Sequence, residues 1–416
     1  MPAFDVSAGG NRQVDGRPLV ADGGTETIIP TGSGTTTSPW IYDWDNIDGG
    51  GNDASDHLIL GNSRLWTTNH SAAGLGSFAL KLRNANGKGN ILGNSGVIAL
   101  ATTNATALGA NPATVGSITL SNVNHIAIGG IDTSRRSTST STPGGNSGHI
   151  TIGHPLDRAG DVRIDFIRTG AHLRTYSRGN AGNVTIYGNS YVKIMNSSGV
   201  LGDIIAWTIG YDGGRITINH DGDFMVRHIN AESGGGWSGG ARGRWVRLSG
   251  DALKNGANGM CYIAGSITNA QTRAVYGANN ENVDIEGYTN VFIAGGIYSY
   301  NATPSAYTAG NIYITNITGD ITIGGPIHAN AANGDTRDGD LKLWCTGTIR
   351  LDSLDLSIVK TAQLYGNNHS WIKRDLTFFP VATPANGELD AKAGQRIYYG
   401  KWSPYNAYLG LSLIHI

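Results

Sequence analysis

Apolar and polar residues alternate in short runs along most of this chain, and the runs recur at a nearly constant interval. The clearest runs have the form Gly-x-Ile-x-Ile or a close variant of it. The first apolar positions of four successive runs lie 32, 34 and 32 residues apart: Ile118, Ile150, Val184 and Ile216. Alternation with period two predicts β-strands, and a repeat of this length predicts a solenoid.

The repeat also indicates how the coils bury their apolar side chains. Each strand has one apolar face, which a single coil cannot bury, so successive coils must stack and pair their backbones. We therefore expect the four residues above to occupy equivalent inward positions, one coil apart. No stretch of twelve residues has a helical pattern. The prediction is an all-β fold, a single-stranded parallel β-helix of roughly ten coils.

The regularity of the repeat predicts how the chain is divided. Residues 1–75 are expected to form irregular N-terminal coils or a cap, residues 76–365 the β-helix, and residues 366–410 a further C-terminal β segment. Residues 411–416, Leu-Ser-Leu-Ile-His-Ile, resemble the translated read-through of a sequencing-library adapter. We therefore expect a metagenomic origin for the sequence, with a reading frame that continues beyond it.

Polar loops interrupt the repeat at one phase, after the second strand of a coil. They cover Ser134–Ser147, Gly170–Ala181, Tyr300–Ala309 and Asn330–Arg337, and the insert Ser197–Gly213 is assigned to the same phase. Loops at one phase project from one edge, where insertions often mark a binding face. The alternative is that this corner simply tolerates length. The candidate ligand-binding residues are Arg135, Arg136, Tyr176, Tyr300 and Arg337.

Composition excludes several functional classes. Glycine is frequent, 62 of 416 residues, but follows no collagen period. Charged residues make up 15% and the net charge is −1, which gives no electrostatic signature of a nucleic-acid-binding protein. No segment is apolar enough to span a membrane, and no signal peptide is visible. Cys261 and Cys345 are expected to remain separate thiols.

The repeats resemble those of a known group of proteins. The runs Gly116–Ser134, Gly148–Ile152, Gly182–Ile186 and Gly310–Ile327 look like the haemagglutination-activity and autotransporter-passenger repeats of large bacterial exoproteins. The resemblance covers roughly residues 90–365. It implies a right-handed parallel β-helix in an extracellular or cell-surface protein. That group has no shared catalytic motif, so the resemblance assigns no functional residue.

One acidic loop is the best candidate for a metal site. Asp43, Asp45 and Asp48 lie in a segment rich in glycine and asparagine, and Ca²⁺ prefers several such oxygen ligands on a flexible loop. The spacing does not fit an EF-hand. The alternative is that these are solvated carboxylates of turns. No other cofactor is expected.

Other β-helix functions leave different traces in a sequence. A polysaccharide lyase or glycosidase needs carboxylates or a base and a cation converging on one outward face. Arg163, Asp165 and Arg168 lie on one run, and the alternation places Arg163 and Asp165 on the same face. An ice-binding solenoid needs flat ranks of threonine, of which Thr119, Thr151, Thr185 and Thr217 suggest one.

These observations favour a structural and adhesive function. We expect a β-helix stalk of a secreted or cell-surface bacterial protein, part of a longer polypeptide, whose polar loops contact surface glycans or other cell-surface components. The chain is expected not to be an enzyme. The alternatives are a carbohydrate-active β-helix enzyme or phage tailspike, and an ice-binding surface.

Overall fold

The structure is a computed structural model that describes most of the chain. The described residues are 3–24, 26–35, 37–44, 57–68, 78–81, 89–103, 115–134, 146–170, 179–208, 211–234, 242–251, 259–270, 279–302, 307–331, 338–355, 361–366, 369–377, 388–391, 396–399 and 412–415. They form β-strands and connections without any helix, so none of them could cross a bilayer as a helix. The chain divides into two compact units, Met1–His220 and Asp221–Ile416.

The first unit contains three parallel sheets, with six strands each, and a hairpin of β3 (Leu19–Val20) and β4 (Thr27–Ile28). Sheet 1 has the order β1 (Ala3–Asp5), β6 (His57–Gly61), β9 (Asn90–Gly93), β12 (His125–Ile128), β15 (Asp161–Ile164), β18 (Val192–Ile194). Sheet 2 has the order β2 (Asn11–Gln13), β7 (Arg64–Thr68), β10 (Ile98–Thr103), β13 (Gly130–Asp132), β16 (Ile167–Arg168), β19 (Ile204–Ile205). Sheet 3 has the order β5 (Trp40–Asp43), β8 (Phe78–Lys81), β11 (Ile118–Ser121), β14 (Ile150–Ile152), β17 (Val184–Tyr187), β20 (Ile216–Asn219).

The second unit repeats this arrangement of parallel strands, except that its last pair, β37 and β38, is antiparallel. Its sheet 1 has the order β21 (Phe224–Val226), β24 (Met260–Ile263), β27 (Asn290–Ile293), β30 (Ile321–Ile323), β33 (Ile349–Asp355), β35 (His369–Thr377), β37 (Arg396–Tyr399), β38 (Ser412–His415). Its sheet 2 has β22 (Ile229–Asn230), β25 (Ile267–Thr268), β28 (Ile297–Tyr298), β31 (Ile327–His328). Its sheet 3 has β23 (Val246–Ser249), β26 (Val283–Glu286), β29 (Ile312–Ile317), β32 (Leu341–Cys345), β34 (Thr361–Gly366), β36 (Glu388–Ala391).

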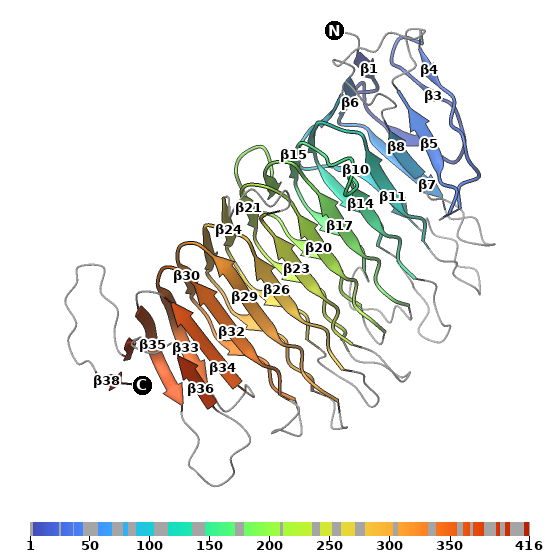
Figure 1. The fold of residues 1–416 in the computed structure, drawn as a ribbon. Helices are drawn as coiled ribbons and strands as arrows, with labels where there is room; N and C mark the ends of the chain where they lie inside the picture. Colours follow the sequence, from blue (N-terminus) through green and yellow to red (C-terminus); the bar gives the residue numbers. More distant parts are fainter. Residues whose placement is uncertain are drawn as a thin grey trace. The chain divides into compact units, whose positions relative to one another are not determined.

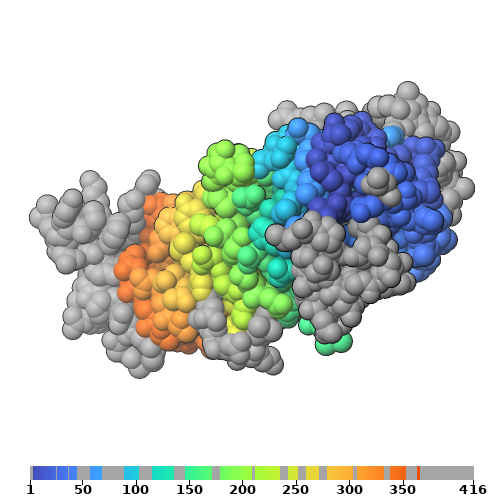
Figure 2. Space-filling view, turned by 90° about the horizontal axis from the view of Figure 1, so that it is seen from above, coloured from blue at the N-terminus to red at the C-terminus, as the bar shows by residue number. Residues whose placement is uncertain are grey.

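From β1 to β32, each turn of chain contributes one strand to sheet 1, one to sheet 2 and one to sheet 3 before the next turn begins, which is the topology of a β-solenoid. In Figure 1 the strands of successive turns lie side by side within each unit. In Figure 2 the sequence colours of each unit follow one another as consecutive bands, as stacking in chain order requires. The all-β parallel solenoid predicted from the repeat is therefore confirmed.

The number of regular turns is smaller than expected. The solenoid has about seven regular turns, against the roughly ten coils predicted. The difference arises at the ends of the repeat. The described parts of the first turns are interrupted by longer connections, and among the described strands sheet 2 stops at β31 while sheets 1 and 3 continue.

The apolar stripe predicted from the sequence forms the core. Ile118 pairs with Ile150, Ile150 with Val184, and Val184 with Ile216, and all four side chains are completely buried. The four residues therefore lie one turn apart at equivalent inward positions, as predicted, and one strand step corresponds to about 4.8 Å. Both cysteines, Cys261 and Cys345, are free and buried, as predicted.

A column of glycines brings successive turns of the first unit close together before sheet 3. A Cβ on Gly148 would lie 1.8 Å from the carbonyl oxygen of Gly116, and one on Gly182 would lie 1.8 Å from that of Gly148. Gly214 stands in the same relation to Gly182, at 1.9 Å. Close backbone approach therefore explains the glycine that begins each repeat.

The long loops leave the coil at one connection, between sheet 2 and sheet 3. In the first unit Ser134–Ser147 follows β13 and Gly170–Ala181 follows β16; in the second, Tyr300–Ala309 follows β28 and Asn330–Arg337 follows β31. Only the ends of these loops lie within the described residues. The assignment of Ser197–Gly213 is correct only for its last part. Residues 206–213 lie between β19 of sheet 2 and β20 of sheet 3, whereas the turn Asn196–Val200 connects β18 of sheet 1 to β19 of sheet 2.

Hydrogen bonds join the two ends of two long loops of the first unit where these leave the coil. In the first unit the buried hydroxyl of Thr133 donates to the Gly148 carbonyl at 2.7 Å, and that of Thr169 donates to the Gly182 carbonyl at 2.5 Å. The amides of the two glycines donate back to the carbonyls of the two threonines, at 3.3 and 3.1 Å. We call this arrangement the loop neck. It holds together the backbone segment that enters a loop and the one that leaves it, independently of the sequence of the loop.

Candidate functional site

A groove lies on the outward face of sheet 3 in the second unit. It crosses β23, β26, β29 and β32 and has a volume of about 590 Å³, within the range of small-ligand sites. Three steps between neighbouring strands make it about 14 Å wide. Its lining residues are mainly aromatic and charged: Trp245, Arg247, Asp284, Ile285, Glu286, Tyr313, Thr315, Asn316, Lys342 and Trp344.

The alternation of the strands places these side chains outward. Val283 and Ile285 of β26 are completely buried, so Asp284 and Glu286 point to the opposite face. The parallel register puts Arg247 beside Asp284, Asp284 beside Tyr313, and Tyr313 beside Lys342. One rank of Arg, Asp, Tyr and Lys therefore crosses the groove, and Glu286 and Thr315 pair in the next rank.

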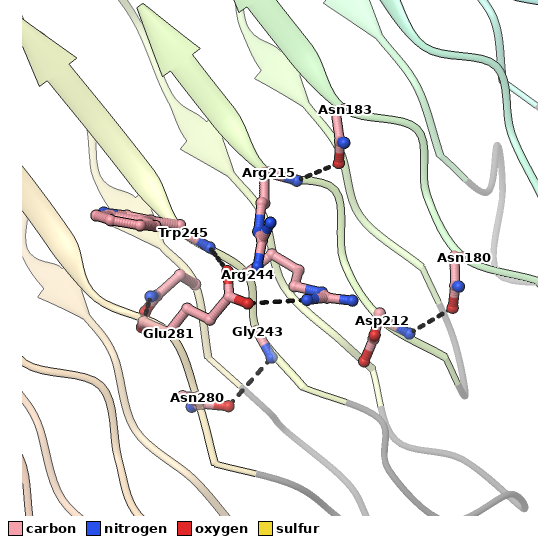
Figure 3. Close-up of polar contacts among 10 residues, drawn as sticks. Asn180, Asn183, Asp212, Arg215, Gly243, Arg244, Trp245, Asn280 and Glu281 are labelled. Atoms are coloured by element: carbon pink, nitrogen blue, oxygen red, sulfur yellow. Dashed lines mark hydrogen bonds and ion pairs between the residues drawn. The ribbon is translucent and has the colours of Figure 1, made fainter.

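Trp245 is fixed at one end of the groove by an ion pair at the start of β23. Arg244 Nη1 lies 2.8 Å from Glu281 Oε1, and the Trp245 backbone amide donates to Glu281 Oε2 at 3.1 Å (Figure 3). The indole Nε1 of Trp245 then donates to Asp284 Oδ2 at 2.6 Å. The tryptophan is thus held at both its backbone and its ring.

The Asp284 carboxyl is partly buried in the groove. Its Oδ1 is shielded from solvent and has no hydrogen-bond partner among the described residues. Burial raises the pKa of Asp284, and the nearby Glu286 charge adds to the rise, while the Trp245 hydrogen bond and Arg247 oppose it. Asp284 therefore holds a proton to higher pH than an exposed aspartate does.

The cations of the groove are both close to aromatic rings. Arg247 Nη2 lies 3.0 Å from Glu286 Oε1, and the Arg247 guanidinium is 5.8 Å from the centre of the Trp245 ring. Lys342 Nζ lies 3.9 Å from the centre of the Trp344 ring. Trp344 is 38% exposed and would present the part of its ring that Lys342 leaves open to a ligand.

Asn316 marks an irregularity at the edge of the groove. It has a φ of 56°, in the left-handed region that asparagine tolerates better than most residues, and it is exposed. The pairing of β29 with β32 shifts register between Ile314 and Ile317. The bulge turns the Asn316 amide, a hydrogen-bond donor and acceptor, towards the groove lining.

Most of the residues predicted to bind ligands lie outside the described part of the chain: Arg135, Arg136, Tyr176 and Arg337. Tyr300 is described, and it is half-buried just beyond β28. Burial raises the pKa of its hydroxyl, with smaller contributions from Glu232 and Tyr298. The structure does not place Tyr300 among the lining residues of the groove.

The acidic loop considered as a calcium site is only partly described. Asp43 ends β5 and pairs with Lys81 of β8, while Asp45 and Asp48 lie outside the described residues. Within the described residues there is no cluster of three histidine, cysteine, aspartate or glutamate side chains that could hold a metal ion. The calcium site stays a prediction.

Asp165 holds another turn of the coil and does not form an exposed pair with Arg163. Arg163 lies in β15, whereas Asp165 is buried at the corner that follows. Its Oδ2 accepts the Gly96 amide at 2.6 Å and its Oδ1 accepts the Ser95 hydroxyl at 3.0 Å. Both carboxylate oxygens are occupied in holding an earlier turn, so the pair does not form a catalytic site.

The threonines predicted to align form one row, without a second row beside it in the described residues. Thr119, Thr151, Thr185 and Thr217 pair in sequence across sheet 3 of the first unit. The outward residues one step further along β11, β17 and β20 are Ser121, Tyr187 and Asn219. In the described residues this face therefore lacks the second threonine rank that an ice-binding surface requires.

The groove was not predicted from the sequence, although the repeats carry a signal for it. Its signal is a change in the outward residues of the Val-x-Ile-x repeats, from threonine in the first unit to arginine, aspartate, tyrosine and lysine in the second. Aligning the repeats by their inward residues would have placed these four side chains in one rank. Comparison of the chain with models of protein families, with curated proteins and with solved structures finds no match.

Proposed function

We propose that this protein is an adhesive β-solenoid that binds carbohydrate through the groove on sheet 3 of its second unit. The observation that carries the proposal is the combination of Trp245, Tyr313 and Trp344 with paired charges on one outward face. Sugar rings combine apolar faces with rings of hydroxyls. An extended site with aromatic walls and both donors and acceptors suits them.

The solenoid fold supports a scaffolding role for the rest of the chain. Outward residues on rigid, stacked strands are held in fixed relative positions, so a ligand does not have to order them on binding. We propose an extracellular or cell-surface location, with surface glycans as partners. The polar loops that remain undescribed would be secondary contacts in this proposal.

The test is polysaccharide binding by the purified chain and by Trp344→Ala. Removing an aromatic side chain that contacts a ligand directly can cost more than about 1 kcal/mol. We expect affinity to fall roughly tenfold, because each 1.4 kcal/mol corresponds to a factor of ten. Tyr262→Ala is the matched control, since Tyr262 stacks on Phe292, with ring centres 5.3 Å apart, on sheet 1.

Two results would overturn the proposal. One is the absence of binding to every polysaccharide in a broad panel by a chain whose circular dichroism shows folded β-structure. The other is equal loss of binding in Trp344→Ala and Tyr262→Ala, which would place the contact elsewhere. Product release is measured in the same samples, because two carboxylates on one face are also what a glycosidase needs.

The contacts of those carboxylates favour binding over hydrolysis. Asp284 Oδ2 accepts the Trp245 indole, and Glu286 Oε1 is paired with Arg247. In a glycosidase one carboxyl group must protonate the leaving oxygen of the glycosidic bond and the other must contact a water molecule. Here one oxygen of each carboxyl group is already engaged by a protein side chain. Steady release of sugars, lost in Glu286→Gln, would replace adhesion by hydrolysis as the function of the groove.

A further inference from the structure

The charges in the groove balance one another. Arg247 and Lys342 contribute two positive charges, and Asp284 and Glu286 contribute two formal negative charges, so the formal sum is zero. Arg247 is already neutralised by Glu286, with a 3.0 Å contact. The groove therefore has no guanidinium free to bind an anion.

An acidic sugar would meet repulsion in this setting. Its carboxylate or sulfate would have to approach Arg247, and Glu286 lies beside that guanidinium. Like charges placed together in a partly desolvated site discriminate strongly against a ligand. Lys342 lies over the Trp344 ring, so an anion drawn to its ammonium would meet the ring that a sugar would contact.

A neutral sugar introduces no charge and can form hydrogen bonds with both the positive and the negative groups of the groove. Its hydroxyls can donate to the carboxylate of Glu286 and accept from the cations and from the Asn316 amide. Each hydroxyl is both donor and acceptor, so it can bridge an alternating rank of positive and negative groups without introducing charge. The rank Arg247, Asp284, Tyr313 and Lys342 has this character.

We propose that the groove selects uncharged, hydroxyl-rich glycans and rejects those with carboxylates or sulfates, and that Glu286 sets this preference by neutralising Arg247. The inference rests on the proposed function, whose carbohydrate contact it makes more specific. Glu286 acts here as a specificity-determining residue. Its removal should free the Arg247 guanidinium for an anionic partner.

The experiment compares the wild-type chain with Glu286→Gln and with Asp320→Asn. Asp320 lies 2.5 Å from Arg350 and forms a similarly exposed ion pair on sheet 1. Each variant replaces one carboxylate by an amide, so the two variants change the net charge equally. Binding is measured for a neutral glucan, mannan and xylan and for polygalacturonate, at low and high NaCl. Far-UV circular dichroism and thermal unfolding verify that each variant is folded.

We expect the wild-type chain to bind at least one neutral polysaccharide roughly tenfold more tightly than polygalacturonate. Glu286→Gln should gain about tenfold in affinity for polygalacturonate, and the gain should shrink with added salt. Asp320→Asn should behave like the wild type. Preference of the wild type for polygalacturonate, or a Glu286→Gln variant no better at binding it than Asp320→Asn, would overturn the inference while adhesion stands. Binding of no polysaccharide would overturn both.

Discussion

The loop necks offer the sharpest test of what holds a turn together. Thr169 is completely buried, and its hydroxyl donates to the Gly182 carbonyl at 2.5 Å. Thr169→Val keeps the shape of the side chain and removes the donor. The carbonyl would remain at the same place, buried in the neck, without its side-chain partner.

The expected cost follows from two contributions. A typical hydrogen bond contributes about 1 kcal/mol net, and a buried acceptor left unsatisfied adds about 1–3 kcal/mol. Valine regains part of this through its extra apolar surface and its high β-propensity. We expect Thr169→Val to lower the free energy of unfolding by about 2 kcal/mol.

Urea denaturation followed by circular dichroism measures this difference. The matched control is Thr185→Val, the same change at an outward, half-buried position of β17. Substitutions at such positions usually change stability by less than about 0.5 kcal/mol. The m-values of the two variants should agree, so that midpoints can be compared directly.

Equal midpoints for Thr169→Val and Thr185→Val would refute the argument. That result would mean that the hydrogen bond of the Thr169 hydroxyl contributes nothing to the free energy of unfolding. A large loss in Thr185→Val would also contradict it, because the outward threonine rank would then be stabilising the solenoid. In either case the pinched connection would need another explanation.

Three further predictions follow from the structure. Gly182→Ala should destabilise the first unit by about 2 kcal/mol or more, because its Cβ would clash with a backbone carbonyl, whereas Gly93→Ala, whose nearest contact is 3.5 Å away, should cost less in the same thermal-unfolding assay. Asp165→Ala should cost about 2–4 kcal/mol in urea denaturation, because it leaves the Gly96 amide without its acceptor, and wild-type stability in this variant would contradict the assignment. Asp284→Asn should raise stability relative to the wild type at neutral pH, and the gain should vanish towards about pH 3; a gain independent of pH would argue against a raised pKa. The sign follows because a raised pKa means that the folded state binds the proton more tightly, so wild-type stability falls as pH rises above the ordinary aspartate value of about 3.9.

The solenoid was predictable because its signal repeats. Every turn must place an apolar residue such as Ile150 at the same inward position, and period-two alternation leaves few other ways to bury it. The position of a loop within the turn could also be predicted where glycine and strand patterns flank the loop. It failed at Asn196–Val200, because a turn between sheets 1 and 2 has the same composition as one between sheets 2 and 3.

The groove was not predicted, for a physical reason. Outward residues are under no packing constraint, so no single repeat distinguishes a ligand contact from an ordinary solvated side chain. Asp284 becomes unusual only because the register brings Trp245 and Arg247 next to it from a strand 37 to 39 positions away. Asp165 shows the reverse error, since period two alone cannot reveal that the strand ends at Ile164 and that the next residue is bound by the connection of another turn.

The necks have a consequence for how such a chain can change over generations. Because Thr133 and Gly148 close the connection at its base, the register of the strands on either side does not require a particular length for the segment between them. A gene can therefore lengthen, shorten or replace that segment in one step, at a cost that grows only with the logarithm of its length. The same property makes these connections suitable sites for grafting foreign peptides, with each turn offering one independent position for display.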